Sequence, residues 1–108
     1  NKRKQNDIVF FDLEQAIDMY KVTDLKDFIV SEIEQNSHEK VVFNFDKVNY
    51  IDSTGLGMFV GIFKKFLNKS HIRFCSLSDH VHKVFKLTAF DQFFNIDTTE
   101  YDSIEVLR

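Results

Sequence analysis

The sequence predicts a single α/β domain in which strands and helices follow the order ββαβαβαβα. Short apolar runs with a period of about two residues alternate with amphipathic segments whose period is about 3.6 residues. The length of 108 residues suits one domain with its own core, so we expect residues 1–108 to form one unit. Because helices separate the strands, we expect a mixed, mostly parallel sheet with helices packed on it.

The first half of the chain predicts extended segments and one helix. The expected extended segments are residues 8–13, a short piece beginning at 16–17, and a buried strand at 40–45. The helix opens at residues 23–25, where Thr23 or Asp24 can cap it, and it ends at residues 36–38. The apolar residues expected on its buried face are Val22, Leu25, Ile29 and Ile33.

The second half predicts three helices and two strands. A helix follows Ser53 and continues to about Lys69. Residues 71–77 form a strand with Ile72 and Phe74 on one face and Arg73 and Cys75 on the other. Ser78 and Asp79 cap a helix that carries Val81, Val84 and Phe85. Residues 93–96 form the last strand, and Thr98 or Thr99 starts a helix through Tyr101, Ile104 and Leu107.

The composition argues against several classes of protein. A net charge of −3 and a pI of about 5.8 disfavour a surface that binds nucleic acid, because such surfaces neutralise phosphates. No window approaches the roughly 18 consecutive apolar residues of a membrane span. The basic segment 1–6 precedes too short an apolar stretch for a secretory signal. Since the chain does not begin with methionine, we expect that residues were removed before Asn1.

The cysteine and aromatic content give two further expectations. A single cysteine, Cys75, permits no intrachain disulfide and suits a reducing, cytoplasmic location. Since Cys75 lies in a predicted strand, we expect it to be buried and unreactive. The thirteen phenylalanines, without any tryptophan, are interpreted as core filling, because too few basic residues accompany them for a base-stacking surface.

Asp52-Ser53-Thr54-Gly55-Leu56-Gly57 is the most informative segment of the chain. It joins the apolar run 41–45 to an amphipathic run, so the hydrophobic period changes there from strand-like to helix-like. The first N–H groups of a helix lack internal partners, and the positive end of the helix dipole lies there. An anion at Ser53 is therefore favoured, and a phosphate ester is the obvious anion.

Ser53 also has a purely structural interpretation as a helix N-cap, whose oxygen would accept a backbone N–H. By local chemistry alone this interpretation is the stronger one, and the neighbouring residues shift the balance. Asp52 could orient an incoming hydroxyl or strengthen the cap, and it could repel a phosphate once added. The two glycines that follow permit close approach of another backbone.

The helix after Ser53 has two apolar residues whose role helical periodicity does not decide. At about 100° per residue, Leu56, Phe59, Val60, Phe63 and Leu67 share a core-facing arc. Met58 and Ile62 fall on the opposite side, with Lys65 and Lys69. They are either scattered surface apolar residues or a docking patch beside a modifiable serine.

Other chemistry finds little support. The glycine spacing of Gly55, Gly57 and Gly61 loosely fits a dinucleotide loop, but the strand is expected to end near Phe45 and no acidic residue stands where a ribose needs one. Ile51 stands where a hydrolase elbow needs glycine. The four histidines, His38, His71, His80 and His82, have no spacing typical of a triad or a zinc site. We therefore expect no catalytic residue, cofactor or metal.

The segment from Val41 to Lys65, VVFNFDKVNYIDSTGLGMFVGIFKK, resembles the phosphorylation-site region of STAS domains, in particular the bacterial anti-sigma-factor antagonists. The resemblance covers nearly the whole chain. Asp-Ser before Thr-Gly-Leu-Gly is typical of the phosphorylatable members. Asp18 lies in a segment similar to the family's acidic loop before the first helix. The chain departs from the family at Gln15-Ala16, Lys69-Ser70 and Ala89-Phe90, where glycine-containing pairs are usual.

The resemblance implies a partner-switching role. Ser53 would be the phosphoacceptor, with Thr54 a weaker second candidate. The unphosphorylated chain would bind an anti-sigma factor that is also a serine kinase and release a sigma factor, phosphorylation would end the complex, and a serine phosphatase would reset it. The residues expected to contact the partner are Asp18, Asp52, Ser53, Thr54, Gly55, Met58 and Ile62.

Two alternatives stay open at this point. The domain could be a STAS scaffold or sensor subunit in which Ser53 is only a cap. It could also be a small nucleotide-binding protein built on the glycine loop. Phosphorylation in cells separates the first alternative from the switch, and nucleotide binding that depends on Gly57 would support the second.

Overall fold

The computed structural model describes residues 1–66 and 70–108, and a mixed sheet organises them. The strands are β1 (Lys2–Gln5), β2 (Ile8–Ile17), β3 (Lys40–Ile51), β4 (His71–Cys75) and β5 (Ile96–Asp97). They lie in the order β1-β2-β3-β4-β5, with β1 antiparallel to β2 and each later pair parallel. The predicted α/β class, the mostly parallel sheet and the order ββαβαβαβα are confirmed.

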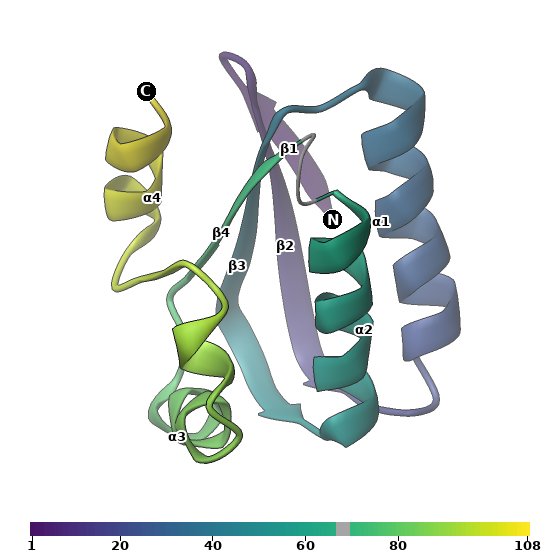
Figure 1. Cartoon of the computed structure of the whole chain (residues 1–108), viewed down its shortest axis with the longest axis vertical. Coiled ribbons are helices and arrows are strands. Elements are labelled where there is room, and N and C mark those ends of the chain that lie inside the picture. The colour runs from purple at the N-terminus through teal and green to yellow at the C-terminus, as the bar shows by residue number, and fades with distance from the viewer. Residues whose placement is uncertain (67–69) are drawn as a thin grey trace.

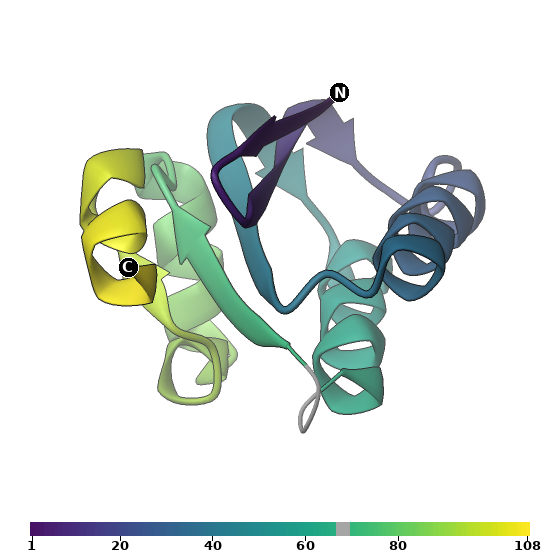
Figure 2. The ribbon, with the colours of Figure 1, turned by 90° about the horizontal axis from the view of Figure 1, so that it is seen from above.

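Helices cover both faces of the sheet (Figures 1 and 2). They are α1 (Val22–Asn36), α2 (Ser53–Lys65), α3 (Asp79–Leu87) and α4 (Glu100–Leu107), with a short 3₁₀ turn at Phe90–Gln92. α1 and α2 lie side by side and begin at the same end of the molecule (Figure 1). α3 adds Val81 and Phe85 to the core beneath these helices, whereas Leu107 of α4 packs on the opposite face.

The core between sheet and helices is aromatic, as the composition predicted. Phe43, Phe59 and Phe74 meet with ring centroids 5.2–5.5 Å apart, and Phe94 stacks on Phe74 at 4.7 Å. Rings at these separations add specific packing to the burial of apolar area. Leu67, which was expected in the core, and the expected continuation of the helix to Lys69 lie outside the described residues.

The first two strands differ from the predicted ones. β1 was missed because its four residues are all exposed and polar, so the edge strand carries no apolar pattern. A two-residue turn at Asn6-Asp7 joins it to β2, with Asn6 at φ 58°. The two pieces expected at 8–13 and 16–17 are one strand, β2. Its register shifts near Gln15, whose φ is 57°, and such a bulge interrupts the two-residue period.

Four other boundaries also differ. β3 does not end near Phe45 but continues to Ile51, because Val48 and Ile51 still bury side chains in the core. The dinucleotide loop was disfavoured partly because the strand was expected to end near Phe45, and that expectation is wrong. α1 begins at Val22 without a side-chain cap. β4 ends at Cys75, and the last strand is Ile96–Asp97 because residues 90–92 form the 3₁₀ turn.

Several other local predictions agree with the structure, whereas the one for Tyr101 does not. Ser78 caps α3 by accepting from the Val81 N–H, and Thr99 caps α4 by accepting from the Asp102 N–H. Ile72 and Phe74 lie in the main core, and Cys75 lies on the other face of β4. Tyr101 is exposed because α4 turns Ser103 and Leu107 toward the sheet instead. No helix in the described residues is long and apolar enough to cross a bilayer.

Candidate functional site

The candidate site lies where β2 and β3 end and α1 and α2 begin, at the lower end of Figure 1. Two connections meet there: the loop from Asp18 to Lys21, and Asp52, which alone separates β3 from α2. Because β2 and β3 are parallel neighbours, their carboxyl ends bring these connections together. The Asp52-Ser53 segment and the loop that begins at Asp18 are therefore adjacent.

Asp52, and not Ser53, is the N-cap of α2. Its Oδ1 accepts the Gly55 N–H at 2.9 Å, and its backbone is extended, as an N-cap requires. Its Oδ2 accepts the Met19 N–H at 3.2 Å, and its own N–H donates to the Ile17 carbonyl at 3.3 Å. The structural interpretation of Ser53 as the cap is therefore wrong, because the preceding carboxylate already occupies that role.

Ser53 is the first residue of α2 and its side chain is exposed. Its hydroxyl makes no hydrogen bond to the part of the chain that the structure describes. The first intrahelical bond is donated by Leu56 to the Asp52 carbonyl, so the Ser53 and Thr54 N–H groups precede the regular ladder. An exposed hydroxyl at the positive end of a helix dipole can accept a phosphoryl group, and the helix dipole stabilises the negative charge of the resulting ester.

Asp18 shapes the loop before α1. Its Oδ1 accepts the Tyr20 N–H at 3.0 Å, and its carbonyl accepts the N–H groups of Lys21 and Val22 at 3.0 and 3.2 Å. Asp18 is half-buried, so it acts mainly as a turn former. The loop is thus held by bonds from within, and Asp52 ties it to α2 from outside.

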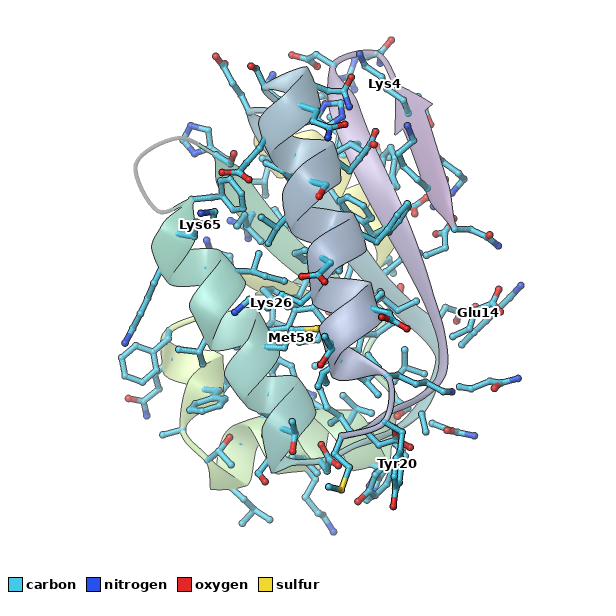
Figure 3. The ribbon with its side chains drawn as sticks, turned by 90° about the vertical axis from the view of Figure 1, so that its right-hand side faces the viewer. Lys4, Glu14, Tyr20, Lys26, Met58 and Lys65 are labelled. Atoms are coloured by element: carbon cyan, nitrogen blue, oxygen red, sulfur yellow. The ribbon has the colours of Figure 1, made fainter. Side chains whose placement is uncertain are left out.

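The same loop exposes two large side chains that sequence reasoning missed. Met19 is 61% exposed and Tyr20 is 86% exposed. Tyr20 lies beyond the first turns of α1 and α2 in Figure 3. Methionine and tyrosine are enriched in protein interfaces. Two large side chains in a four-residue loop that joins a strand to a helix were the signal available in the sequence.

Met58 and Ile62 do not form an exposed patch, and this prediction is wrong. Met58 is 5% exposed and Ile62 is 1% exposed, and both belong to the main core. Figure 3 shows Met58 where α1 and α2 meet. The reason is that α2 packs on α1 as well as on the sheet, so its buried arc is wider than one contact requires.

The three glycines of α2 have different surroundings. Gly55 is buried, and a Cβ there would lie 2.7 Å from the Ile17 carbonyl oxygen and 2.9 Å from the Ile51 side chain. The backbone that approaches Gly55 closely is therefore that of Ile17 in this chain. Gly55 was predicted to contact the partner at the surface, and its burial contradicts that prediction. A Cβ at Gly61 would lie 3.2 Å from Lys26 Nζ, whereas Gly57 has nothing within 4 Å.

A shallow groove of about 280 Å³ runs between the first halves of α1 and α2. Its lining includes Thr54 and Gly57 from α2 and Thr23 and Lys26 from α1. The buried Met58 forms part of its floor. Thr54 therefore faces α1, and the groove continues the exposed surface that begins at Ser53.

Groups capable of nucleophilic or metal chemistry lie elsewhere or are unsuited to it. Burial raises the pKa of the Cys75 thiol to about 11, so the thiol stays protonated near neutral pH, as the expectation of an unreactive cysteine requires. Residues 1–66 and 70–108 contain no group of three His, Cys, Asp or Glu side chains able to hold a metal ion. His80 stacks on Tyr50, with ring centroids 6.3 Å apart.

The marked carboxylate shifts belong to structural ion pairs. The Arg73 guanidinium, 2.8 Å from Asp97, holds the pKa of that carboxyl below its usual range. Hydrogen bonds from Arg3 lower the pKa of Asp12 in the same way, and Arg3 also pairs with Glu100. These pairs tie β4 to β5 and β1 to α4, and none of them involves the residues at the start of α2.

Comparison with known proteins identifies the family. A sequence model of the STAS domain matches residues 1–103, nearly the whole chain. The chain belongs to the STAS domain family. The match includes every residue of the candidate site, from Asp18 to Ile62.

The chain is also similar to proteins that are named as anti-sigma factor antagonists. The anti-sigma-B factor antagonist of Staphylococcus aureus (strain NCTC 8325 / PS 47) is 28% identical over 82 residues, which are 75% of this chain and 75% of that protein. An anti-sigma factor antagonist from Mycobacterium paratuberculosis has a TM-score of 0.90 at 17% identity, covering 98% of this chain and 90% of its own. The Bacillus cell fate determinant SpoIIAA in its phosphorylated form has a TM-score of 0.74 at 20% identity, covering 100% and 98%. At these identities the solved structures show the fold.

Proposed function

We propose that this STAS domain is an anti-sigma-factor antagonist, a binding protein and not an enzyme, whose partner is chosen by phosphorylation of Ser53. The unphosphorylated chain binds an anti-sigma factor that is also a serine kinase, and a sigma factor is thereby released. The observation that supports this best is the exposed Ser53 hydroxyl beside a helix cap that Asp52 already provides. A serine that does not cap the helix is dispensable for folding at this position.

The chemistry of the switch is an ordinary phosphoryl transfer. The partner kinase passes the γ-phosphoryl group of ATP to Ser53 Oγ, the hydroxyl proton leaves, and ADP is released. A separate serine phosphatase hydrolyses the ester and restores the hydroxyl. Thr54, whose side chain lines the groove toward α1, is the weaker second acceptor.

The partner surface combines a modifiable serine with an ordered apolar anchor. Ser53, Thr54, Asp18 and Asp52 supply its polar part. Met19 and Tyr20 supply the exposed apolar part that Met58 and Ile62 were expected to provide. Since the Met19 and Tyr20 N–H groups already donate to the carboxylates of Asp52 and Asp18, the loop is fixed and little ordering entropy is lost on binding.

Electrostatics explains how phosphorylation would end the complex. A phosphate adds about −1.5 to −2 charges beside the carboxylates of Asp52 and Asp18. In an interface that excludes water this charge brings repulsion and a desolvation cost, whereas in the free protein the helix dipole stabilises it. A coupling of about 1–3 kcal/mol is enough to exchange partners.

Intact mass with phosphosite mapping tests the proposal. The chain is incubated with ATP and a soluble extract of its own host, in parallel with Ser53→Ala and Thr54→Val. One phosphate on the natural chain and on Thr54→Val, and none on Ser53→Ala, is the expected result. No modification by an active extract would overturn the switch and favour a scaffold or sensor role.

The apolar anchor has its own test. Tyr20→Ala should weaken binding to the host's anti-sigma factor by about tenfold or more, with little change in thermal stability, because Tyr20 is 86% exposed. Phe93→Ala is the matched control, since Phe93 is 67% exposed in the segment after α3. If Tyr20→Ala and Phe93→Ala bind the anti-sigma factor with equal affinity, Tyr20 does not contact the partner.

A further inference from the structure

Asp52 uses both carboxylate oxygens, and they serve different parts of the molecule. Oδ1 accepts the Gly55 N–H inside α2, and Oδ2 accepts the Met19 N–H in the loop before α1. The backbone N–H of Asp52 also donates to the Ile17 carbonyl. One side chain therefore connects the residue that precedes Ser53 to the loop that exposes Met19 and Tyr20.

We propose that Asp52 is a positioning residue that holds the Met19-Tyr20 loop in its binding conformation, and that a phosphate on Ser53 releases this hold. This inference rests on the proposed function and adds its regulation. The phosphate thus weakens partner binding through this chain's own structure, in addition to direct repulsion of the partner.

The contacts of the loop show why the release would be selective. Tyr20 and Lys21 donate their N–H groups to Asp18, so the turn is closed from within. The Ile17 carbonyl is held by the Asp52 backbone, which a change in the side chain leaves in place. Only the Met19 N–H depends on the Asp52 carboxylate. Loss of that bond frees Met19 from α2 without unfolding β2, and the turn that carries Tyr20 is then held only by the bonds to Asp18.

The phosphate would compete with Asp52 at the start of α2. It brings three acceptor oxygens to the residue next to the cap, within the same helical turn as the Gly55 N–H. Its charge also repels the adjacent carboxylate, and both effects draw Asp52 away from its present position. A group that accepts the Gly55 N–H can replace Oδ1, but a phosphate on α2 does not restore the specific bond to Met19.

Amide hydrogen exchange and NMR on the isolated chain test the release directly. Phosphoserine is introduced at position 53 during synthesis, so the experiment needs no kinase. We expect exchange of the Met19 amide to become about tenfold faster, as the loss of one hydrogen bond to a charged group implies. Amides of the central strands should be unchanged. An unaltered Met19 amide in the phosphorylated chain would overturn the release.

Asp52→Ser separates positioning from helix capping. Serine is a good N-cap and keeps an acceptor for the Gly55 N–H, but its single short hydroxyl does not also reach Met19. We expect faster Met19 exchange and about tenfold weaker binding to the anti-sigma factor, with the midpoint of unfolding nearly unchanged. Asp24→Ser removes the same charge from the exposed first turn of α1 and should alter neither readout.

The outcomes distinguish this inference from the switch itself. If phosphoserine at position 53 abolishes partner binding while the Met19 amide is unchanged, the switch stands and the role of Asp52 is wrong. If Asp52→Ser leaves both Met19 exchange and binding unchanged, the positioning role is wrong. The third outcome is faster exchange of the Met19 amide both in the chain with phosphoserine at position 53 and in Asp52→Ser, while the extract never phosphorylates Ser53. In that case Asp52 does position the loop, and the proposed function fails.

Discussion

The glycines of this protein and its left-handed residues occupy different regions. All three glycines lie in α2, and none has a positive φ. Elsewhere in the described residues the positions with positive φ are filled by Asn6, Gln15, Ser37, Ser76 and Ala89. Glycine is usually needed for exactly such a left-handed backbone, so its absence there and its presence in a helix call for another explanation.

Space explains two of the three glycines from within the chain. Gly55 lets α2 approach the Ile17 carbonyl, and Gly61 lies beneath the end of Lys26. A Cβ at Gly57 would meet nothing within 4 Å, although glycine in a helix interior costs about 0.5–1 kcal/mol relative to alanine. Under the proposed function, a partner that approaches the bare backbone at Gly57 would be the reason for a glycine there. The start of α2 thus has a closed side at Gly55 and an open side at Gly57.

The largest effect is expected where the two sides adjoin, at Met58. Met58→Glu places a carboxylate in the core between α1, α2 and the sheet, where Met58 is 5% exposed. It should lower the free energy of unfolding by about 4 kcal/mol or more. Lys64→Glu, on the exposed side of the same helix, should cost under about 1 kcal/mol. Urea denaturation compares the two variants. If Met58→Glu lowers the free energy of unfolding only slightly, the Met58 side chain is exposed and not buried in the core.

The next effect is at Gly55. Gly55→Ala puts a Cβ 2.7 Å from a backbone oxygen and 2.9 Å from two isoleucine side chains, so the junction of β2 and α2 must shift. We expect a loss of about 2–3 kcal/mol, typical of overpacking against backbone. Chemical denaturation measures it. A loss no larger than that of Gly61→Ala, whose neighbour is a flexible lysine, would mean that the junction yields easily.

The fold was predictable where local signals agree with the tertiary structure. The starts of α3 and α4 were predicted at Ser78-Asp79 and at Thr98 or Thr99. The hydroxyls of Ser78 and Thr99 cap these helices by accepting N–H groups three residues ahead. Ile29 and Ile33 lie on one face of α1, as their spacing predicted, because that helix has a single buried stripe. The element order agrees although β1 was missed, because β2 was expected as two separate pieces.

The errors arise where packing partners, and not the local pattern, decide burial. α2 contacts both the sheet and α1, so its buried arc runs over roughly 160° from Met58 to Leu56. Centring the arc on Leu56 alone placed Met58 outside it. β1 is held by its pairing with β2 and by Arg3, which lies 4.7 Å over Phe10, and a polar edge strand shows no such partner in its own sequence.

The strand-to-helix junction before α2 was predicted from the sequence, but the structural roles of the residues within it were not. The Asp52-Ser53 motif lies at the strand-to-helix junction that the change of hydrophobic period predicted, and the structure places Asp18 in the neighbouring loop. Which of two adjacent residues caps the helix depends on where β3 ends, and β3 continues to Ile51. The exposure of Met19 and Tyr20 depends on a loop conformation fixed by a residue 33 positions away, which periodicity does not contain.

A smaller effect is expected at the left-handed positions. Gln15 and Ala89, with φ of 57° and 61°, stand where the resemblance to the family expects glycine-containing pairs. Replacing each by glycine removes the left-handed strain but loosens the unfolded chain, so each should add about 0.5–1 kcal/mol of stability. Thermal unfolding measures the gain, and Gln15→Ala is the control that keeps a Cβ. A loss in both glycine variants would show that these side chains hold contacts worth more than the strain.

Gly57→Ala has the smallest expected effect on stability and the most informative effect on function. Alanine fits without contact and is the better helix former, so the free energy of unfolding should rise by about 0.5 kcal/mol. If a partner approaches α2 at this bare backbone, the added methyl should weaken binding to the anti-sigma factor, measured by calorimetry. Gly61→Ala, one turn further along the same helix, is the matched control. Opposite changes in stability and affinity at Gly57 alone have no explanation inside the folded chain, whereas unchanged affinity would place the interface nearer to Tyr20 and Ser53.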